Sequence, residues 1–101
     1  MRKYTLTKKA DRELEDILFY TKNQWGDNQF EKYTAEIYGM FEKLSENPNL
    51  GTPADYIFKG VRKLPLGKHL VFYIILEKQV VIVRILHSSQ DIEKVDFNLH
   101  T

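Results

Sequence analysis

The sequence predicts a single α+β domain: a short strand, an antiparallel hairpin of two helices, and then three strands. Two observations carry this prediction. Apolar residues recur every three or four positions through the first half of the chain, and β-branched and aromatic residues form continuous runs in the second half. A chain of 101 residues is long enough for one hydrophobic core but not for two. We therefore expect residues 1–101 to form one domain.

The N-terminal part of the chain predicts a strand and the first helix. Residues 3–6 alternate in polarity as a strand does, and Thr7 offers a hydroxyl that can cap a helix N-terminus. Gly26 is a typical helix end, and Asp27 can cap whatever follows. The stripe at helical spacing consists of Ala10, Leu14, Ile17, Leu18, Thr21 and Trp25.

A second amphipathic helix follows and ends at Asn47-Pro48, because proline cannot continue a helix. Two helices joined by a glycine-centred turn make an antiparallel hairpin. Their apolar stripes are too wide to bury each other completely, so a sheet must cover them. The second stripe consists of Phe30, Tyr33, Ile37, Met40, Phe41 and Leu44.

Three strands are predicted after a loop over residues 49–59: residues 61–66, 69–76 and 79–86. Pro65 indicates that the first of them is an edge strand, since proline lacks an amide donor. Glu77-Lys78 is short enough for a tight antiparallel hairpin. The continuous apolar character of the other two strands indicates that both of their faces are covered. Residues 91–97 have the composition of one or two turns of helix.

The composition excludes several classes of protein. It is that of a folded chain, with 43% hydrophobic and 29% charged residues, and the absence of cysteine excludes disulfides and thiolate metal sites. A net charge of +1 lacks the basic excess of a protein that binds nucleic acid non-specifically, although residues 59–87 carry six basic side chains against one acidic. No apolar run has the length of a membrane span or a signal peptide, so we expect a cytoplasmic protein.

Five separated segments resemble the toxins of the RelE/ParE superfamily, and in particular its ParE branch. The resemblance implies a helical hairpin packed on a curved antiparallel sheet. The segments are Tyr4-x-Leu6 with Ala10, Leu14 to Ile17, Tyr20-Thr21 and Trp25-Gly26; Phe41-x-x-Leu44-x-x-Asn47-Pro48-x-x-Gly51; Gly60-Val61-Arg62-Lys63; His69-Leu70-Val71-Phe72-Tyr73; and Val83-Arg84-Ile85-Leu86-His87 with Asp91.

The resemblance to the ParE branch implies a function as the toxin of a type II toxin–antitoxin system. Such a toxin is not an enzyme and needs no cofactor; it binds DNA gyrase and traps the cleaved-DNA intermediate, so that replication stalls. It also implies a cognate ParD-like antitoxin, whose flexible C-terminal segment folds over the toxin. Because such an antitoxin carries its own DNA-binding domain, the toxin would contact DNA only through the antitoxin or gyrase.

Two sets of residues are candidates for these interactions. The set for the target and for toxicity comes from the second half of the chain and consists of Lys59, Arg62, Lys63, Arg84, His87 and Asp91. The set for the antitoxin is aromatic and consists of Tyr20, Trp25, Tyr33, Tyr38 and Tyr56. The three histidines, His69, His87 and His100, lack the spacing of metal ligands, so we expect no metal site.

Two alternatives stay open. A RelE-like ribosome-dependent mRNA endonuclease needs a base, an acid and cations, for which Arg62, Arg84 and His87 are catalytic candidates beside Lys59, Lys63 and His69. Branches of the family that cut RNA typically carry a tyrosine or histidine near the C-terminal end. This chain has no tyrosine beyond Tyr73, but His87 and His100 leave the nuclease open. The other alternative is a non-toxic binding module of the same fold.

Several candidates also have a structural interpretation. Trp25 can fill the core at the turn between the helices, as large aromatic residues often do. Arg62 and Arg84 lie among apolar strand residues, where each can pair with a carboxylate such as Asp91 or Glu77. His87 stands at the end of a strand, where a histidine with internal hydrogen bonds is common.

Overall fold

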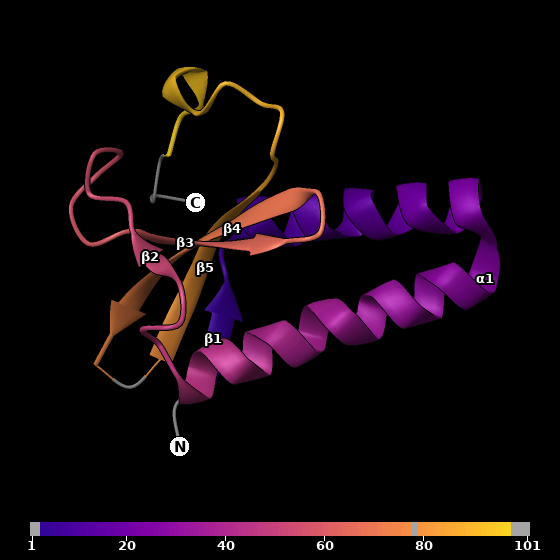
Figure 1. Cartoon of the computed structure of the whole chain (residues 1–101), viewed down its shortest axis with the longest axis horizontal. Helices are drawn as coiled ribbons and strands as arrows, with labels where there is room; N and C mark the ends of the chain where they lie inside the picture. Colours follow the sequence, from indigo (N-terminus) through magenta and orange to yellow (C-terminus); the bar gives the residue numbers. More distant parts are fainter. Residues whose placement is uncertain (1–2, 78, 98–101) are drawn as a thin grey trace.

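The computed structural model describes residues 3–77 and 79–97, which form a five-stranded sheet with one long, sharply bent helix against it (Figure 1). This confirms the α+β class. The sheet has the order β1-β5-β4-β3-β2. In chain order the elements are β1 (Lys3–Leu6), α1 (Lys8–Glu46), β2 (Thr52–Pro53), β3 (Arg62–Leu66), β4 (His69–Leu76), β5 (Gln79–His87) and the 3-10 turn η1 (Ile92–Lys94).

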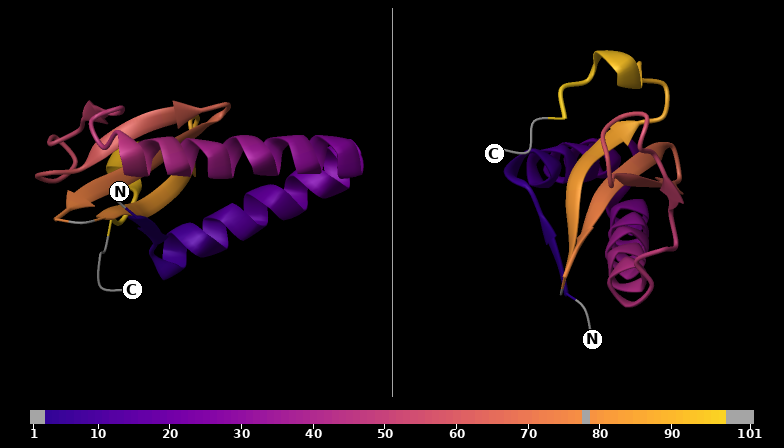
Figure 2. Two further views of the ribbon diagram at one scale, coloured as in Figure 1. Left: turned by 90° about the horizontal axis from the view of Figure 1, so that it is seen from below. Right: turned by 90° about the vertical axis from the view of Figure 1, so that its left-hand side faces the viewer.

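The structure has one kinked helix, α1, in place of the two separate helices predicted. Thr7 is the N-cap as expected, and its hydroxyl oxygen accepts from the Ala10 amide at 3.1 Å. Gly26 is the only residue inside α1 with a non-helical backbone (φ 85°, ψ −179°), and Asp27 is already helical. A single glycine can therefore turn the chain without an intervening loop. The two arms of α1 run back from this bend, which projects beyond the sheet (Figures 1 and 2).

The sheet is mixed, so the prediction of an antiparallel sheet holds for four of its strands only. β2, β3, β4 and β5 pair antiparallel, whereas β1 pairs parallel to β5 with Tyr4 opposite Val80. The parallel pairing leads directly into the helix, because the Thr7 amide continues the ladder with a bond to the Ile82 carbonyl oxygen (3.0 Å). Leu76 and Gln79 pair at the predicted β4–β5 hairpin, and Lys78 in its turn lies outside the described residues.

β3 is not the edge strand that Pro65 indicated. The short strand β2, which lies within the predicted loop, pairs with Arg62 and Lys63 of β3. Pro65 lies past the end of this pairing, on a stretch of β3 whose outer side carries no ladder within the described residues. Proline is tolerated there because no neighbouring strand of the described chain needs its missing amide. β3 is therefore an edge strand at Pro65 but not at Arg62 and Lys63.

Apolar side chains cover both faces of β4 and β5, as predicted. On one face the helix-side core joins α1 to the sheet, with Leu14 and Phe41 packed around Tyr73. On the opposite face the tail-side core includes Phe72 and is covered by residues 54–61 and 92–97. The helix therefore covers one face, and two short segments cover the other (Figure 2).

The C-terminal part of the described chain has the lower of the predicted one or two turns of helix. Residues 91–97 contain a single 3-10 turn, and the Asp91 side chain caps it by accepting from the Glu93 amide at 3.1 Å. Across residues 3–77 and 79–97, no helix is both long enough and apolar enough to cross a membrane.

Candidate functional site

The first turns of α1 complete the edge of β5 where β1 ends. β1 pairs with β5 only as far as Ile82. Beyond that point the Thr7 hydroxyl donates to the Val83 carbonyl oxygen (2.9 Å), and the Glu13 carboxylate accepts from the Ile85 amide (3.0 Å). Buried backbone groups at a sheet edge need such partners. As a result, Glu13 is fixed directly beside β5.

Arg84 joins this carboxylate to the C-terminal tail. Its Nε lies 3.1 and 3.2 Å from the two oxygens of Glu13, and one Nη donates to the same carboxylate at 2.9 Å. The other Nη donates to the Asp96 carbonyl oxygen at 2.6 Å, and the guanidinium lies 5.8 Å from the centre of the Phe97 ring. Only 14% of the Arg84 side chain and 22% of the Glu13 side chain are exposed. Arg84 is therefore engaged inside the molecule.

The carboxylate that pairs with Arg84 was not predicted. The sequence suggested Asp91 or Glu77, but the salt bridge is formed with Glu13, and Asp91 instead caps η1. Glu13 was missed because it is one of several polar positions on an amphipathic helix. Nothing in its local spacing marks it as buried.

Arg62 serves a different segment. It donates to the carbonyl oxygens of Gly51 (2.6 Å) and Asn49 (3.3 Å), while its buried Nε has no hydrogen-bond partner within the part of the chain that is described. The buried Tyr73 hydroxyl lies beside it, donating to the Pro48 carbonyl oxygen and accepting from the Gly51 amide, both at 2.8 Å. Together these two side chains hold the turn that leaves α1.

His69 and His87 are brought together across β4 and β5. They are paired directly, and their ring centroids are 5.4 Å apart. The hydroxyl of Tyr33, on the second arm of α1, lies 3.1 Å from Nδ1 of His69. Burial lowers the pKa of His69, and the neighbouring His87 lowers it further. Burial, together with the nearby Glu36 carboxylate, raises the pKa of Tyr33.

The imidazole of His87 is held by the turn that follows β5. Its Nδ1 accepts from the Ser89 amide at 3.1 Å and lies 2.6 Å from the Ser89 hydroxyl oxygen. A ring nitrogen that accepts from an amide carries no proton, so the proton of neutral His87 is on Nε2. His69 and His87 thus form a cluster that does not include Arg62 or Arg84, whose polar partners are elsewhere.

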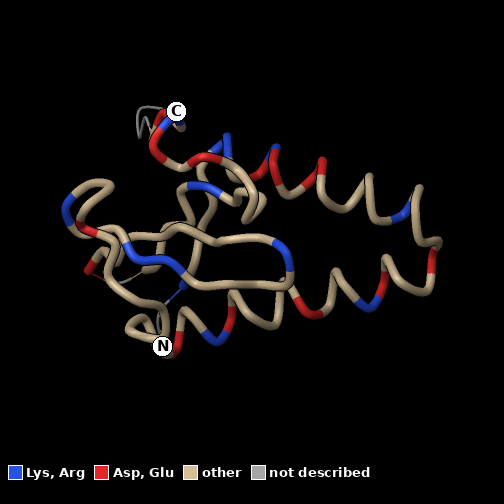
Figure 3. Tube along the Cα trace, turned by 45° about the horizontal axis from the view of Figure 1, so that its top comes forward, with Lys and Arg blue, Asp and Glu red and all other residues tan. Residues whose placement is uncertain are grey.

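The remaining basic candidates, Lys59 and Lys63, lie before and in β3, toward the β2 edge of the sheet. Lys63 donates to the Tyr56 hydroxyl at 3.0 Å and lies 5.4 Å from the centre of that ring, and Lys59 is exposed in the segment before β3. Figure 3 shows Lys and Arg in this segment, along β3 and in the β3–β4 turn, whereas α1 carries both signs of charge. The predicted target residues are therefore spread over two regions of the surface.

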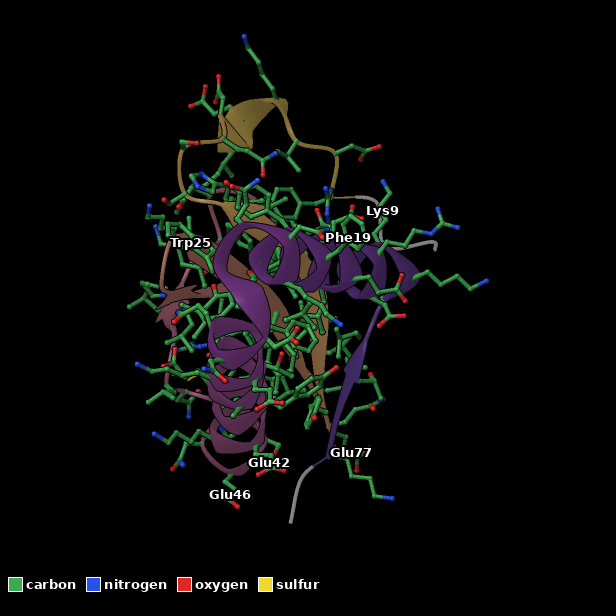
Figure 4. All side chains as sticks on the ribbon, turned by 90° about the vertical axis from the view of Figure 1, so that its right-hand side faces the viewer. Lys9, Phe19, Trp25, Glu42, Glu46 and Glu77 are labelled. Atoms are coloured by element: carbon green, nitrogen blue, oxygen red, sulfur yellow. The ribbon has the colours of Figure 1, made fainter. Side chains whose placement is uncertain are left out.

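Most of the aromatic candidates are exposed. Trp25 is 69% exposed and does not fill the core, because the bend of α1 projects past the sheet that would have covered it. Phe19, which the sequence reasoning missed, is 72% exposed. The sequence could have indicated this exposure, since Phe19 is a large apolar residue outside the apolar stripe of an amphipathic helix. Figure 4 shows Phe19 along the first arm and Trp25 at the bend of α1.

The other aromatic candidates differ from one another in exposure and position. Tyr20 and Tyr56 are 61% and 71% exposed, Tyr38 is 41% exposed, and Tyr33 is half-buried against His69. For metals, the described part of the chain holds no group of three or more His, Cys, Asp or Glu side chains arranged to bind an ion. His100 lies outside the described residues.

Comparison with known proteins gives consistent matches over nearly the whole chain. A family model described as ParE toxin of type II toxin–antitoxin system, parDE, matches residues 4–92. The chain is 34% identical over 91 residues to Toxin ParE1 of Caulobacter vibrioides, a match that covers 90% of this chain and 94% of the relative. It is also 34% identical over 93 residues to Toxin ParE1 of Mycobacterium tuberculosis, covering 91% and 95% of the two chains.

The fold also matches a solved structure. A chain from the chromosomal ParDE toxin–antitoxin system of P. aeruginosa superposes with a TM-score of 0.72 at 24% sequence identity. The match covers 86% of this chain and 96% of that chain. At this level of identity the likeness shows a shared fold.

Proposed function

The chain belongs to the ParE toxin family of type II toxin–antitoxin systems, and from this we propose that it inhibits DNA gyrase by stabilising the cleaved-DNA complex, which blocks replication. The observation that carries the proposal is the family match over residues 4–92. The mechanism is differential binding: the toxin holds gyrase more tightly in the cleaved state than in the resealed state, and so shifts the population toward broken DNA. This action belongs in the cytoplasm, where gyrase works.

Among the predicted target residues, we assign direct contact to those whose side chains reach solvent. Lys59, His87 and Asp91 are exposed, and Lys63 is half-exposed beside Tyr56. Lys59 and Lys63, the two lysines of this set, suit a target that holds DNA, because phosphates attract positive charge. Arg62 and Arg84 support the same activity indirectly, through the segments that they hold.

A ParD-like antitoxin is the partner that we propose for the aromatic side chains. Phe19, Tyr20 and Trp25 are exposed on the first arm of α1, where no other segment of the described chain covers them. Six positions separate Phe19 from Trp25, which places them about 120° apart around the helix axis, so one flat surface cannot cover both. A segment that folds as it binds can wrap around the arm. The toxin then meets promoter DNA only through the antitoxin.

The geometry favours this function over an mRNA endonuclease. A nuclease of the kind considered would use Arg62 and Arg84 to hold the phosphate, yet both guanidinium groups bind backbone or carboxylate oxygens of the protein itself. The third catalytic candidate, His87, has its Nδ1 occupied by the Ser89 amide. Internal partners therefore compete with a phosphate at both arginines, and the Ser89 amide leaves His87 only its Nε2 for a substrate.

The test is a supercoiling assay with purified gyrase, run beside a ribosome-containing assay that reports cleaved message. The proposal predicts loss of supercoiling, accumulation of cleaved DNA and intact message. Cut message with untouched gyrase would show an endonuclease instead. No effect in either assay, together with normal growth of cells that express the chain, would indicate a non-toxic binding module.

A further inference from the structure

The segment of residues 91–97 has one polar anchor on the body of the protein. Its own hydrogen bonds are internal to η1: the Asp91 carboxylate accepts from the Glu93 amide, and the Val95 amide donates to the Ile92 carbonyl oxygen. Among residues 3–77 and 79–97, the hydrogen bond from the sheet to this segment is the one between Arg84 and the Asp96 carbonyl oxygen.

An aromatic contact reinforces that anchor. The ring of Phe97 packs against Phe72 and Phe58, with centroid distances of 5.1 and 5.9 Å. Arg84 also lies over the Phe97 ring. Ile92 and Val95 also pack against the tail-side core, but the polar and aromatic contacts of the segment meet where the Arg84 guanidinium reaches Asp96 and Phe97.

The orientation of Arg84 depends in turn on Glu13. Three of its four contacts with oxygen atoms go to the Glu13 carboxylate, and that carboxylate is itself held by the Ile85 amide. A guanidinium presents its donors in a rigid fork, so two parallel bonds to a carboxylate fix the direction of the remaining donors. Glu13 thus directs the free end of the fork at Asp96.

We infer that Glu13 and Arg84 are positioning residues for the inhibition proposed above: they pin residues 91–97 over Phe72 and so fix the exposed Asp91 in the position from which it contacts the target. The inference rests on the proposed function for its biological meaning. Its structural part, the pinning of the segment, is independent of that function. Neither residue touches the target in this scheme.

Detachment of the segment can be measured by limited proteolysis, because Lys94 is exposed within η1 and trypsin cleaves after lysine. A segment that lifts from Phe72 more often is cut faster at Lys94, since a protease acts on the opened form. The measurement is the rate at which residues 95–101 are released from the folded protein, followed by mass spectrometry. Free energies of unfolding are measured in parallel.

The decisive variant is Arg84→Lys, which keeps the positive charge but cannot bind Glu13 and Asp96 with a planar fork. We expect about tenfold faster cleavage at Lys94, the ratio that corresponds to loss of one charge-assisted hydrogen bond. Glu13→Gln and Phe97→Ala should also accelerate it. Asp16→Asn, which neutralises an exposed carboxylate on the same arm, is the matched control and should leave the rate unchanged.

A second control separates positioning from general loss of stability. Ile37→Val removes one methylene group from the helix-side core and lowers global stability without touching the tail. It should leave cleavage at Lys94 and gyrase inhibition as they are. Arg84→Lys and Phe97→Ala should both weaken inhibition in the supercoiling assay, in the order of their effects on cleavage.

The outcomes are distinguishable. Unchanged cleavage in Arg84→Lys would overturn the pinning of the segment. Weakened inhibition with unchanged cleavage would show that Arg84 contacts the target directly, and full inhibition by Phe97→Ala despite faster cleavage would overturn the role in toxicity. If the wild-type protein does not inhibit gyrase, the proposed function fails, while the cleavage ratios still decide whether Glu13 and Arg84 hold the tail.

Discussion

Replacing Tyr73 with phenylalanine removes one buried oxygen atom and leaves two backbone groups without a partner. The Tyr73 hydroxyl accepts from the Gly51 amide and donates to the Pro48 carbonyl oxygen, both at 2.8 Å. The tyrosine itself is fully buried, and Gly51 is buried as well. Phenylalanine preserves the ring and its packing in the helix-side core, so the change isolates the hydrogen bonds.

The expected loss of stability follows from these two groups. An unsatisfied buried donor or acceptor costs about 1–3 kcal/mol, and the Pro48 carbonyl is only partly buried, so the free energy of unfolding should fall by about 2–4 kcal/mol in Tyr73→Phe. Gly51 is packed closely at this point, since a methyl group on it would lie 2.5 Å from the Lys63 carbonyl oxygen and 2.7 Å from the Tyr73 hydroxyl. With a urea dependence of about 1.5 kcal/mol per M, the midpoint should drop by roughly 2 M.

The assay is urea unfolding followed by circular dichroism, with Tyr38→Phe as the control. Tyr38 lies on the second arm of α1, is 41% exposed, and makes an edge-on ring contact with Phe41 that phenylalanine preserves. Tyr38→Phe should therefore unfold within about 0.5 kcal/mol of the wild-type protein, as most surface substitutions do. Equal midpoints for Tyr73→Phe and Tyr38→Phe would refute the claim that hydrogen bonds of the Tyr73 hydroxyl stabilise the turn after α1.

Three further predictions concern His69, Gly26 and the exposed aromatic residues. Because the pKa of His69 is lowered in the folded protein, the unfolded chain binds its proton more readily; stability should be full above about pH 6.5, the unfolded value, and fall as the pH decreases through the lower folded pKa. Urea midpoints at several pH values test this, and a pH dependence that His69→Gln leaves unchanged would contradict it. Gly26→Ala should destabilise the protein by about 1 kcal/mol or more, because its φ of 85° strains any other residue while the added methyl group meets no atom within 4 Å. Thermal unfolding measures this, and an unchanged midpoint would mean that the bend forms differently. Trp25→Ala and Phe19→Ala should leave the midpoint nearly unchanged but weaken binding of the antitoxin by about tenfold or more each, as aromatic anchors do; calorimetric titration with the antitoxin tests this, and full affinity in both variants would place its binding site elsewhere.

Local pattern was enough to predict four of the five strands and the helix start. Thr7 caps α1 as expected, because capping depends on residues three positions apart. β4 and β5 follow from their continuous apolar runs, which only a strand covered on both faces can bury. These features depend on neighbours along the chain, and sequence shows neighbours directly.

The features that were missed depend on contacts between distant segments. The parallel direction of β1 is set by its pairing with β5, and Glu13 becomes special only because β5 extends past β1. Likewise, β2 is two residues long and pairs beside Arg62, which also binds the turn leading to it. None of these contacts leaves a periodic signal.

The sequence indicates residue types for the candidate site but not how they are arranged. Aromatic residues on the first arm of α1 are exposed as an interaction surface requires, yet periodicity could not show that Trp25 lies beyond the sheet. The basic residues are present, but two of the arginines hold backbone segments of the protein itself. The sequence shows which charged side chains exist but not which of them are already bound to other groups of the protein.

The two faces of the sheet are covered by different elements, so we expect them to become exposed to solvent at different rates. One face is closed by a single cooperative element of 39 residues, so exposing it requires most of the molecule to unfold. The other is closed by two short segments, and the C-terminal one can detach while strands and helix stay in place. Amide exchange should therefore be governed by global unfolding in β4 and β5 and by a much cheaper local event in residues 92–97. We therefore expect the apolar surface around Phe72 to be exposed by this local event more often than by global unfolding.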